Sequence, residues 1–333
     1  MGVGYVGSLH ARIYAKLRGA RLVAVCDVDR ARAREVAKPL GCQALTDATE
    51  LTGLVDAASI AVPTSLHHAV GKTLLNAGIH VLIEKPITTT LTEADELLAI
   101  AARRRALIQV GHIERFNAAI QTAKAYLTHP RFIEAHRLSP YPHRGTDVSV
   151  VLDVMIYDLD LVLALVKRQP VQIDALGVPI LSTSEDIANA RLVFPTGCVA
   201  NLTASRVSDE RIRRIRLFQE DCYLSIDYQH QSVELARVSP PPGRSRGRGK
   251  IGRTIRRKTL AVRRRPPLDE ELAAFLKAVR ARAAPFPPAP NSSGRAGVSG
   301  EQAREALALA LAIEQAMRRA RKTVHRPPST VHR

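Results

Sequence analysis

The first third of the chain alternates short runs rich in β-branched residues with helical stretches, and this alternation limits the fold more than any other feature. The expected strands are residues 21–26, 57–61, 80–83 and 107–110. The expected helices are residues 9–18, 30–40, 67–76 and 91–104. Strands that are joined through helices run parallel, so the sequence predicts an α/β fold in which helices cover a parallel sheet.

A glycine-rich motif, Gly2-Val3-Gly4-Tyr5-Val6-Gly7, leads directly into the first expected helix. Glycines at this spacing permit a tight turn and let the backbone approach a pyrophosphate, whose charge is met by the helix N-terminus. Asp27 follows the next expected strand, 20 residues after Gly7, where a carboxylate can accept hydrogen bonds from ribose hydroxyls. We therefore expect NAD to be bound by Gly2, Gly4, Tyr5, Val6, Gly7 and Asp27.

The carboxylate of Asp27 also bears on the choice of cofactor, because it would repel the 2′-phosphate of NADP. NAD is therefore favoured, although Arg30 keeps NADP as an alternative. The other interpretation of Asp27 is a turn or cap residue before the helix that begins at Arg30.

Only Met1 precedes the glycine motif, although in a sheet of this type the glycine turn follows a first strand of about 5 residues. Without that strand its neighbours would lose backbone partners. The first strand is therefore expected to be truncated, through a misplaced start codon or a shortened chain. A stop codon upstream in the same frame, with no apolar run before Met1, would contradict the start-codon explanation.

The loop after residues 57–61 is a second candidate for contact with the dinucleotide. Loops at the carboxyl ends of parallel strands form the ligand crevice of such sheets. Pro63, Thr64 and His67 are therefore predicted to contact the cofactor. The alternative for His67, and for His68 beside it, is a solvated residue in the first turn of a helix.

Glu84, Lys85 and Pro86 end the apolar strand at residues 80–83, and Pro86 stops that strand. A partly desolvated lysine there can hold a substrate hydroxyl and stabilise the alkoxide that forms as hydride leaves. We expect Lys85 to be catalytic and Glu84 to bind the cofactor. The alternative for Lys85 is a solvated residue at the end of a strand.

An apolar helix expected over residues 149–166 carries Asp153, Tyr157 and Asp160 on one stripe. Burial of a carboxylate without a partner is costly, so this stripe should face a polar cavity or cations. A substrate pocket that contains Lys85 would satisfy it. The alternative is a carboxylate that pairs with a buried arginine or caps a helix.

The second part of the chain reads as an α+β domain with a largely antiparallel sheet and helices on one face. Its expected strands include residues 172–178, 189–194, 198–205, 212–219, 222–228 and 233–238. We expect an NAD(P)-binding domain over residues 1–114 and a substrate and oligomerisation domain over residues 115–333. Two further helices are expected over residues 269–282 and 301–318, the second capped by Ser299 with Gln302.

A basic tract explains most of the formal net charge of +18, because residues 237–265 hold twelve Lys and Arg and no acids. The rest of the chain carries only +6. The tract contains no aromatic residue that could stack on bases, so nucleic acid is not an expected partner. Residues 239–267, rich in Pro, Gly and Arg, are predicted to be a disordered insertion, and the basic tail from residue 319 is expected to be frayed.

Cys26, Cys42, Cys198 and Cys222 form no CxxC pair, so neither a metal site nor a disulfide framework is expected. The longest apolar stretch, residues 148–166, contains three aspartates, which is evidence against a membrane span. With no recognisable signal peptide, the predicted location is the cytoplasm.

With these motifs in place, the chain resembles the Gfo/Idh/MocA family of NAD(P)-dependent oxidoreductases. The resemblance rests on GVGYVG with Asp27, VPTSLHH, IEKP, GHIERFN at residues 111–117, DVMIYD and VSGEQAREAL. It implies a Rossmann-type domain, an open-sheet second domain that forms a homodimer or homotetramer, and hydride transfer between nicotinamide and a sugar or cyclitol hydroxyl carbon.

The resemblance also implies residue roles. Lys85 would be the catalytic lysine, with Asp153 and Tyr157 completing the substrate side. Many members have His where this chain has Tyr157. A phenol can also relay a proton, so the identity of the base is left open, with Lys85 acting alone as the alternative.

GHIERFN is most similar to the branch of the family that acts on nucleotide sugars, such as UDP-N-acetylglucosamine at C3. Arg115 and Asn117 would then lie near the sugar or its phosphates. Their alternative is a helix-start arginine and an Asn cap for a helix at Ala118. Other functions left open are an inositol or free-sugar dehydrogenase and a non-catalytic NAD or sugar sensor.

Overall fold

The computed structural model describes residues 1–141, 148–239, 254–283 and 297–324 of the chain. It divides into two compact units. The first comprises Met1–Phe116 and Arg265–Ala308, and the second comprises Asn117–Arg264 and Leu309–Arg333. The first unit thus includes a C-terminal segment that the sequence division placed in the second domain.

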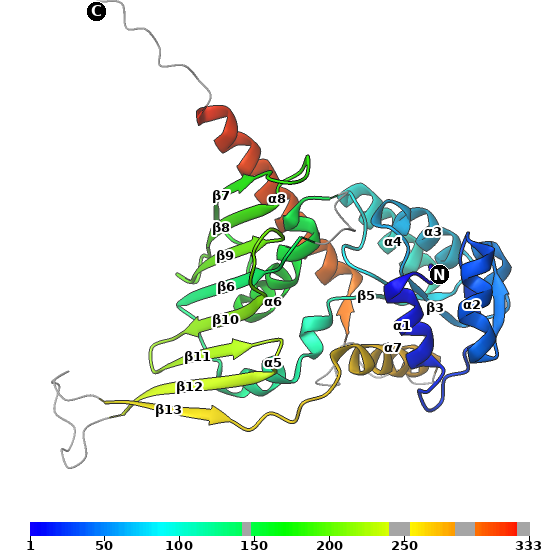
Figure 1. Ribbon diagram of the computed structural model, residues 1–333, viewed down its shortest axis with the longest axis horizontal. Helices are drawn as coiled ribbons and strands as arrows, with labels where there is room; N and C mark the ends of the chain where they lie inside the picture. Colours follow the sequence, from blue (N-terminus) through cyan, green and yellow to red (C-terminus); the bar gives the residue numbers. More distant parts are fainter. Residues whose placement is uncertain (142–147, 240–253, 284–296, 325–333) are drawn as a thin grey trace, which may run out of the picture. The chain divides into compact units, whose positions relative to one another are not determined.

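The first unit is built on parallel strands, as predicted (Figure 1). β3 (Ala57–Ile60), β4 (His80–Ile83) and β5 (Ile108–Val110) are parallel, and the short β14 (Val298–Ser299) pairs antiparallel with β5. β1 (Ala24–Cys26) and β2 (Gln43–Leu45) form a separate parallel pair. The expected Rossmann-type sheet is therefore confirmed, but it is split into a four-stranded and a two-stranded part.

Met1 and Gly2 lie between these two parts. The Met1 amino group donates to Ser59 O at 2.8 Å, Ala61 N–H donates to Met1 O at 2.8 Å, and Gly2 N–H donates to Cys26 O at 2.8 Å. Two residues thus stand where the sequence predicts a truncated first strand.

Helices cover this sheet, and their ends follow local capping rules. They are α1 (Tyr5–Tyr14), α2 (Arg30–Leu40), α3 (His67–Asn76), α4 (Leu91–Arg104), α7 (Pro267–Ala283) and the start of α8 (Gly300–Val324). Thr90 and Glu93 form a capping box at the start of α4. Ser299 and Gln302 exchange the predicted pair of hydrogen bonds before α8, at 3.2 and 3.3 Å.

α7 belongs to the first unit because of its apolar face. Leu272, Phe275 and Val279 form one buried cluster with Leu82 of β4. Residues three and four apart on a helix share one face, so this stripe of α7 packs directly on the sheet.

The second unit is an eight-stranded sheet with the order β13-β12-β11-β10-β6-β9-β8-β7 (Figure 1). All its pairs are antiparallel except β6 with β9. Its strands are β6 (Phe132–Leu138), β7 (Gln172–Val178), β8 (Ile187–Val193), β9 (Val199–Ser205), β10 (Ile212–Phe218), β11 (Cys222–Asp227), β12 (Ser232–Ser239) and β13 (Thr254–Leu260). This confirms the predicted, largely antiparallel second sheet.

One face of this sheet is buried and the other is partly open, as the alternating burial of β6 and β11 shows. The helical elements of this unit are α5 (Ala118–Ala123), a π-helical segment at Val151–Met155, α6 (Ile156–Val166) and the end of α8. The helix predicted over residues 149–166 therefore begins with a wider turn before it becomes α-helical.

The structure contradicts two predictions of disorder over part of their length. Thr254–Leu260 lies within the segment predicted to be disordered, yet it forms β13 and pairs with β12. The sequence analysis missed this strand because of its high arginine content. Leu260 is buried, whereas the side chains of residues 255–259 are exposed. α8 continues to Val324, past the residue where fraying was expected. Residues 240–253 and 325–333 lie outside the described part of the chain.

No helix among the described residues is long and apolar enough to cross a membrane. Within the same residues no group of three or more His, Cys, Asp or Glu side chains could hold a metal ion.

Candidate active site

The glycine turn requires glycine at two positions for steric reasons. Gly2 has φ +73°, and a Cβ there would lie 2.7 Å from Ala61 O. A Cβ at Gly7 would overlap Gly2 O, so α1 can start this close to the turn only with glycine at that position. The first and third glycines of the motif thus let the turn pack against β3 and α1.

Gly4 differs, because a Cβ there would meet no atom within 4 Å. Gly4 is the N-cap of α1, with no side-chain cap and no acidic residue in the first turn. The N–H groups of a first helical turn lack acceptors within the helix and attract anions. An open, uncapped helix start of this kind fits the pyrophosphate of a dinucleotide.

Asp27 ties the end of β1 to this turn. Its Oδ2 accepts a hydrogen bond from Val3 N–H at 2.8 Å, and its Oδ1 accepts one from Asp29 N–H at 3.0 Å. Arg32 lies 3.4 Å from the same carboxylate. Asp27 therefore fits the turn residue that the sequence offered as its alternative, since the N-cap of α2 is Asp29, and it lies beside the glycine turn.

His67 is buried and links the loops that follow β3 and β4. Its Nδ1 lies 2.8 Å from Pro86 O and its Nε2 lies 3.0 Å from Val62 O. Burial lowers the pKa of His67, although both carbonyls oppose that shift. Because both ring nitrogens face carbonyl oxygens of this chain, His67 positions the two loops, and its contact with the cofactor stays a prediction.

The neighbours of His67 lie nearer the surface. Pro63 is exposed and Thr64 is half-buried at the start of a short 3-10 turn, Thr64–Leu66. His68 lies 2.7 Å from Glu96 of α4, so it joins two helices.

Glu84 and Lys85 follow β4, as predicted, and a histidine lies beside them. Glu84 Oε1 is 3.2 Å from Nε2 of His10, which is buried on α1. Burial alone would raise the pKa of Glu84, but the hydrogen bond from His10 and the charges of His10 and Lys85 lower it overall. Lys85 is half-buried, and the carbonyl of Pro86 after it is the one held by His67. Glu84, next to the candidate catalytic lysine in sequence, is thus an ionised carboxylate.

Gly111 makes room for this carboxylate. A Cβ at Gly111 would lie 3.0 Å from both carboxylate oxygens of Glu84. His10 and Gly111 were missed by the sequence analysis. Gly7, His10 and Ala11 form the buried face of α1. Their spacing of three and four residues, which places them on one side of a helix, was the sequence signal that could have identified His10.

In the second unit, an arginine that the sequence analysis missed binds Asp158, which lies on α6 next to Tyr157 of the predicted stripe. Arg137 of β6 holds Asp158 through two hydrogen bonds, Nε to Oδ2 at 2.9 Å and Nη2 to Oδ1 at 3.1 Å, and both side chains are buried. Its guanidinium carbon lies 5.0 Å from the ring centre of Tyr157 and 5.1 Å from that of Tyr228. Arg137 therefore fixes the helix face that carries Tyr157.

The stripe itself is only partly buried. Asp153 and Tyr157 are half-buried, whereas Asp160 is 1% exposed. The carboxylate that pairs with a buried arginine is therefore Asp158, which the predicted stripe does not include, while Asp153 and Tyr157 are the more accessible residues of the stripe.

Arg115 and Asn117 belong to different units. Arg115 is half-buried on a 3-10 turn of the first unit, Ile113–Phe116. Asn117 caps α5, because its Oδ1 accepts from Ala119 N–H at 3.1 Å and its Nδ2 donates to Tyr228 O at 2.9 Å. Asn117 therefore has the capping role that the sequence offered as its alternative, and its contact with the substrate stays a prediction.

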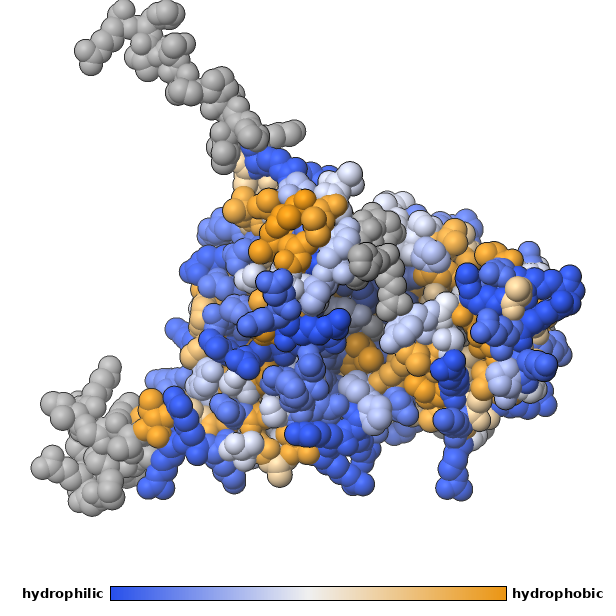
Figure 2. All heavy atoms as spheres, viewed as in Figure 1, coloured by the Kyte–Doolittle hydropathy of each residue, from blue (hydrophilic) through white to orange (hydrophobic). Residues whose placement is uncertain are grey.

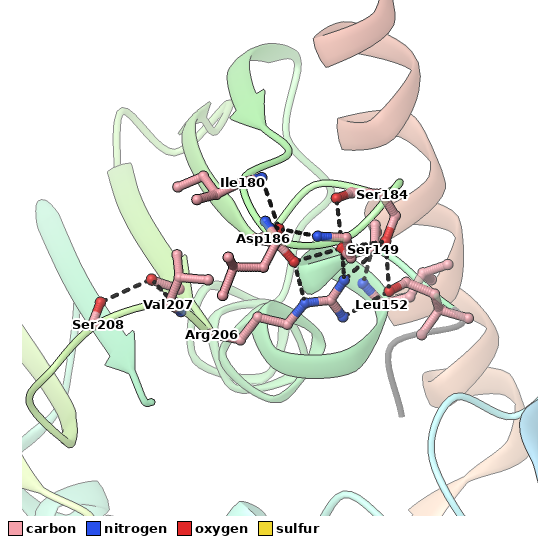
Figure 3. Close-up of polar contacts among 12 residues, drawn as sticks. Ser149, Leu152, Ile180, Ser184, Asp186, Arg206, Val207 and Ser208 are labelled. Carbon is pink, nitrogen blue, oxygen red and sulfur yellow. Dashed lines mark hydrogen bonds and ion pairs between the residues drawn. The ribbon is translucent and has the colours of Figure 1, made fainter. Parts of the chain in front are cut away.

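A buried ion pair anchors the segment just before Asp153 (Figure 3). Arg206 Nε lies 2.8 Å from Asp186 Oδ1, and neither side chain is exposed. Arg206 also donates to Val148 O at 2.9 Å. Asp186 Oδ2 accepts three backbone N–H groups, from Ile180, Leu181 and Ser182.

The pKa of Asp186 reflects this setting. Burial would raise it, but the hydroxyl and backbone of Ser182 and the guanidinium of Arg206 together lower it. Next to Val148, Ser149 hydrogen-bonds Glu314 of α8 and accepts from Leu152 N–H at 3.4 Å. These contacts fix the start of the segment that carries Asp153.

Comparisons with known proteins agree with this arrangement. The family model described as "Oxidoreductase family, NAD-binding Rossmann fold" matches residues 1–112, and the "GFO/IDH/MocA C-terminal domain" matches residues 109–224. UDP-N-acetylglucosamine 3-dehydrogenase from Acidithiobacillus ferrooxidans is 37% identical over 320 residues, which cover 95% of this chain and 96% of that enzyme. A solved structure of that enzyme has a TM-score of 0.82 and covers 95% of both chains.

Inositol dehydrogenases match less completely. Inositol 2-dehydrogenase 4 from Saccharopolyspora erythraea is 34% identical over 172 residues, covering 48% of this chain and 51% of that enzyme. The structure of an inositol dehydrogenase homolog from Azotobacter vinelandii, complexed with NADH and myo-inositol, has the same fold at 18% identity, with a TM-score of 0.77 over 95% of this chain and 93% of that chain. Both family models and the full-length relative confirm the predicted family: this chain belongs to the Gfo/Idh/MocA family of NAD-binding oxidoreductases.

Proposed function

We propose that this protein is an NAD-dependent dehydrogenase that oxidises a secondary hydroxyl of a nucleotide sugar, with UDP-N-acetylglucosamine oxidised at C3 as the first substrate to test. The observation that carries this proposal is the 37% identity to a UDP-N-acetylglucosamine 3-dehydrogenase over 95% of the chain. The chemistry of the site also supports a dehydrogenase. Lys85 follows β4, and the adjacent Glu84 is ionised and paired with His10.

On this proposal, the open helix start at Gly4 and the turn at Gly2 and Gly7 bind the pyrophosphate of NAD. Asp27 meets the adenosine ribose, and its negative charge favours NAD over NADP. When bound, NAD supplies the hydride acceptor. Tyr5, Val6, Pro63 and Thr64 are the further cofactor contacts that we carry forward from the sequence.

Lys85 holds the substrate hydroxyl and stabilises the oxygen as its proton leaves. In the second unit, Asp153 and Tyr157 are the candidates for substrate contact and proton relay, and Arg115 in the first unit is the candidate for a phosphate contact. An ammonium close to the reacting oxygen favours the alkoxide through its charge.

The test follows NADH formation at 340 nm with the full chain, NAD and a panel of UDP-sugars, free sugars and inositols. Lys85→Met should lower turnover at least about 100-fold while NAD still binds by calorimetry. Lys16→Met, an exposed lysine on the same unit, is the matched control and should behave as the unmodified chain. Near-normal turnover of Lys85→Met would contradict the mechanism.

An inositol dehydrogenase is the second candidate, favoured by the partial match to inositol 2-dehydrogenases. Oxidation of myo-inositol, with no reaction of any UDP-sugar, would replace the nucleotide-sugar assignment. Cofactor binding without oxidation of any member of the panel would instead favour a non-catalytic sensor.

We also propose that the open face of the eight-stranded sheet forms a homodimer or homotetramer. Exposed apolar side chains gather at its β7 edge (Figure 2), and they are Val171, Leu176, Val178, Ile180 and Leu181. Exposed apolar patches mark association surfaces. Leu176→Asp with Val178→Asp should shift the mass measured by light scattering toward the monomer, and an unchanged mass would rule this edge out.

A further inference from the structure

The two outermost strands at one edge of the eight-stranded sheet are rich in basic side chains. β13 is the last strand of the sheet, and β12 lies between it and β11. Together β12 and β13 hold four basic residues, Arg237, Arg256, Arg257 and Lys258, and one acidic residue, Glu234. This edge is therefore strongly positive, and it lies at the other end of the strand order from β7.

The pairing of these two strands brings positive charges together. Arg237 lies directly opposite Arg256 in the antiparallel register, and Lys258 projects from the same face as Arg256. Like charges directly opposite each other in a sheet are destabilising. Glu234 does not offset this pair, because it lies opposite Thr259 on the other face. The fold thus keeps an unfavourable cluster of cations at this edge.

Arginines elsewhere in the same sheet have acidic partners. On β10, Arg216 Nη1 lies 3.0 Å from Glu134, and Arg214 Nη2 lies 3.9 Å from Asp227. By contrast, β13 contains no acidic residue, and the side chains of residues 255–259 are all exposed. The cations of β13 are therefore accessible to an anionic partner.

Two exposed apolar side chains lie at one end of the same strands. Val238 is 45% exposed and Ile255 is 66% exposed, and the two are directly opposite each other in the register. In sequence, Arg237 precedes Val238 and Arg256 follows Ile255, so cations flank the apolar pair. Figure 2 shows an apolar patch next to strongly hydrophilic side chains at this end of β12 and β13. Apolar and basic side chains occur together in this way on surfaces that bind an anionic bilayer.

We propose that the edge formed by β12 and β13 binds the surface of an anionic lipid bilayer. Its basic side chains attract the headgroup phosphates, and Val238 and Ile255 enter the boundary between headgroups and acyl chains. A sheet that approaches a flat surface by its edge brings cations from both faces to the phosphates, Arg256 from one and Arg257 from the other. The contact is peripheral and goes beyond the proposed dehydrogenase reaction.

Nucleic acid fits this edge less well than a bilayer does. Neither β12 nor β13 carries an aromatic side chain that could stack on bases. A phosphate backbone also offers nothing apolar to Val238 and Ile255, whereas a bilayer offers acyl chains.

The first test measures co-sedimentation of the full chain with vesicles. Vesicles of phosphatidylcholine and phosphatidylglycerol in about equal parts should bind the protein at least about tenfold more tightly than phosphatidylcholine alone. Raising NaCl from about 50 mM to about 500 mM should weaken this binding at least about tenfold, because salt shortens the range of the attraction. Equal binding to both kinds of vesicle, or no binding to either, would overturn the proposal.

The second test removes three charges from β13. One variant combines Arg256→Gln, Arg257→Gln and Lys258→Gln. It should bind the phosphatidylglycerol vesicles at least about tenfold more weakly. Because all three side chains are exposed, it should keep the melting temperature of the unmodified chain.

The matched control removes the same amount of charge from exposed sites of the first unit, with Arg18→Gln, Arg34→Gln and Lys38→Gln. These substitutions should weaken vesicle binding about twofold at most, since the sites lie outside the proposed contact. Equal losses in the two triple variants would show that only the net charge matters, and the assignment to β12 and β13 would be wrong.

The third test places a tryptophan at the apolar pair. The chain contains no tryptophan, so the fluorescence of Ile255→Trp reports only on the surroundings of that position. Its emission should move to shorter wavelength when phosphatidylglycerol vesicles are added, because the indole leaves water for the interface. Leu181→Trp, at an exposed site after β7, is the control and should show no such change. Vesicle-bound Ile255→Trp with unchanged emission would contradict the predicted insertion.

A DNA duplex of mixed sequence is the competing ligand. If the full chain binds the duplex more tightly than the phosphatidylglycerol vesicles, and the β13 variant loses that binding, the edge recognises nucleic acid and the bilayer proposal fails. None of these measurements uses turnover, so their outcome is independent of the dehydrogenase assignment.

Discussion

The guanidinium of Arg137 lies over the ring of Tyr157, 5.0 Å from its centre, while the same group holds Asp158 with two hydrogen bonds. Tyr157 and Asp158 are adjacent on α6, so one arginine of β6 contacts both the candidate relay residue and the carboxylate next to it. A planar guanidinium can lie over a ring and bind a carboxylate through two parallel hydrogen bonds, a geometry that the ammonium of a lysine does not offer.

Loss of Arg137 should destabilise the protein strongly, because it leaves the buried Asp158 without its charge partner. Arg137→Met is expected to lower the free energy of unfolding by about 3–5 kcal/mol, measured by urea denaturation. Arg137→Met with Asp158→Leu should recover most of that loss. Arg191→Met, an exposed arginine of the same sheet, is the control and should cost at most about 1 kcal/mol. Equal losses in the single and double variants would show that the pair is not coupled.

Substitution of Tyr157 should decide which group relays the proton. If the phenol is the relay, Tyr157→Phe lowers kcat about 100-fold or more, because the ring remains and the hydroxyl is lost. Tyr157→His should recover part of the rate that Tyr157→Phe loses. It should also move the pH at which kcat rises toward the ordinary histidine pKa of about 6.5. The profile of kcat against pH is the measurement. Full activity of Tyr157→Phe would leave Lys85 as the group that acts alone.

The pair of Glu84 and His10 predicts a pH dependence of stability. The folded state lowers the pKa of Glu84 below its ordinary value of 4.5, so the ionised form stabilises the fold above that pH. This stabilisation is lost as the pH falls below 4.5 toward the folded pKa. Glu84→Gln should therefore melt with a flatter pH dependence in acid than the unmodified chain. The exposed Glu35→Gln is the control, and identical acid limbs for Glu84→Gln and the unmodified chain would contradict this prediction.

Asp27 and Arg32 predict how cofactor choice can be changed. Asp27→Asn keeps an oxygen for the amide of Val3 but removes the charge that opposes a 2′-phosphate. It also releases the guanidinium of Arg32, which lies 3.4 Å from Asp27. The ratio of kcat/KM for NAD to that for NADP should fall about tenfold or more. Asp29→Asn, which alters the other carboxylate beside Arg32, should change the ratio less.

The parallel strands and the EKP end of β4 could be predicted because their signals are local. The apolar run at residues 80–83 and the proline at position 86 mark a strand and its end within a few residues. The same holds for the cap of α8, where Ser299 and Gln302 are three residues apart.

The contacts that shape the site are instead long-range. Arg137 and Asp158 are 21 positions apart, and Phe275 packs on a strand that ends almost two hundred residues earlier. Periodicity shows that a face is apolar or charged, but it does not show which distant element covers it. Arginine-rich composition likewise hid β13, because an edge strand needs few buried side chains.

The enclosed position of the Met1 nitrogen has a practical consequence for recombinant preparations. Any affinity tag or linker fused there begins in the protein interior, next to Ser59 and Cys26, before it can reach solvent. The residues adjoining the fusion point therefore become part of the fold. The melting temperatures of recombinant proteins that differ only in this linker should be compared before their kinetic constants are combined.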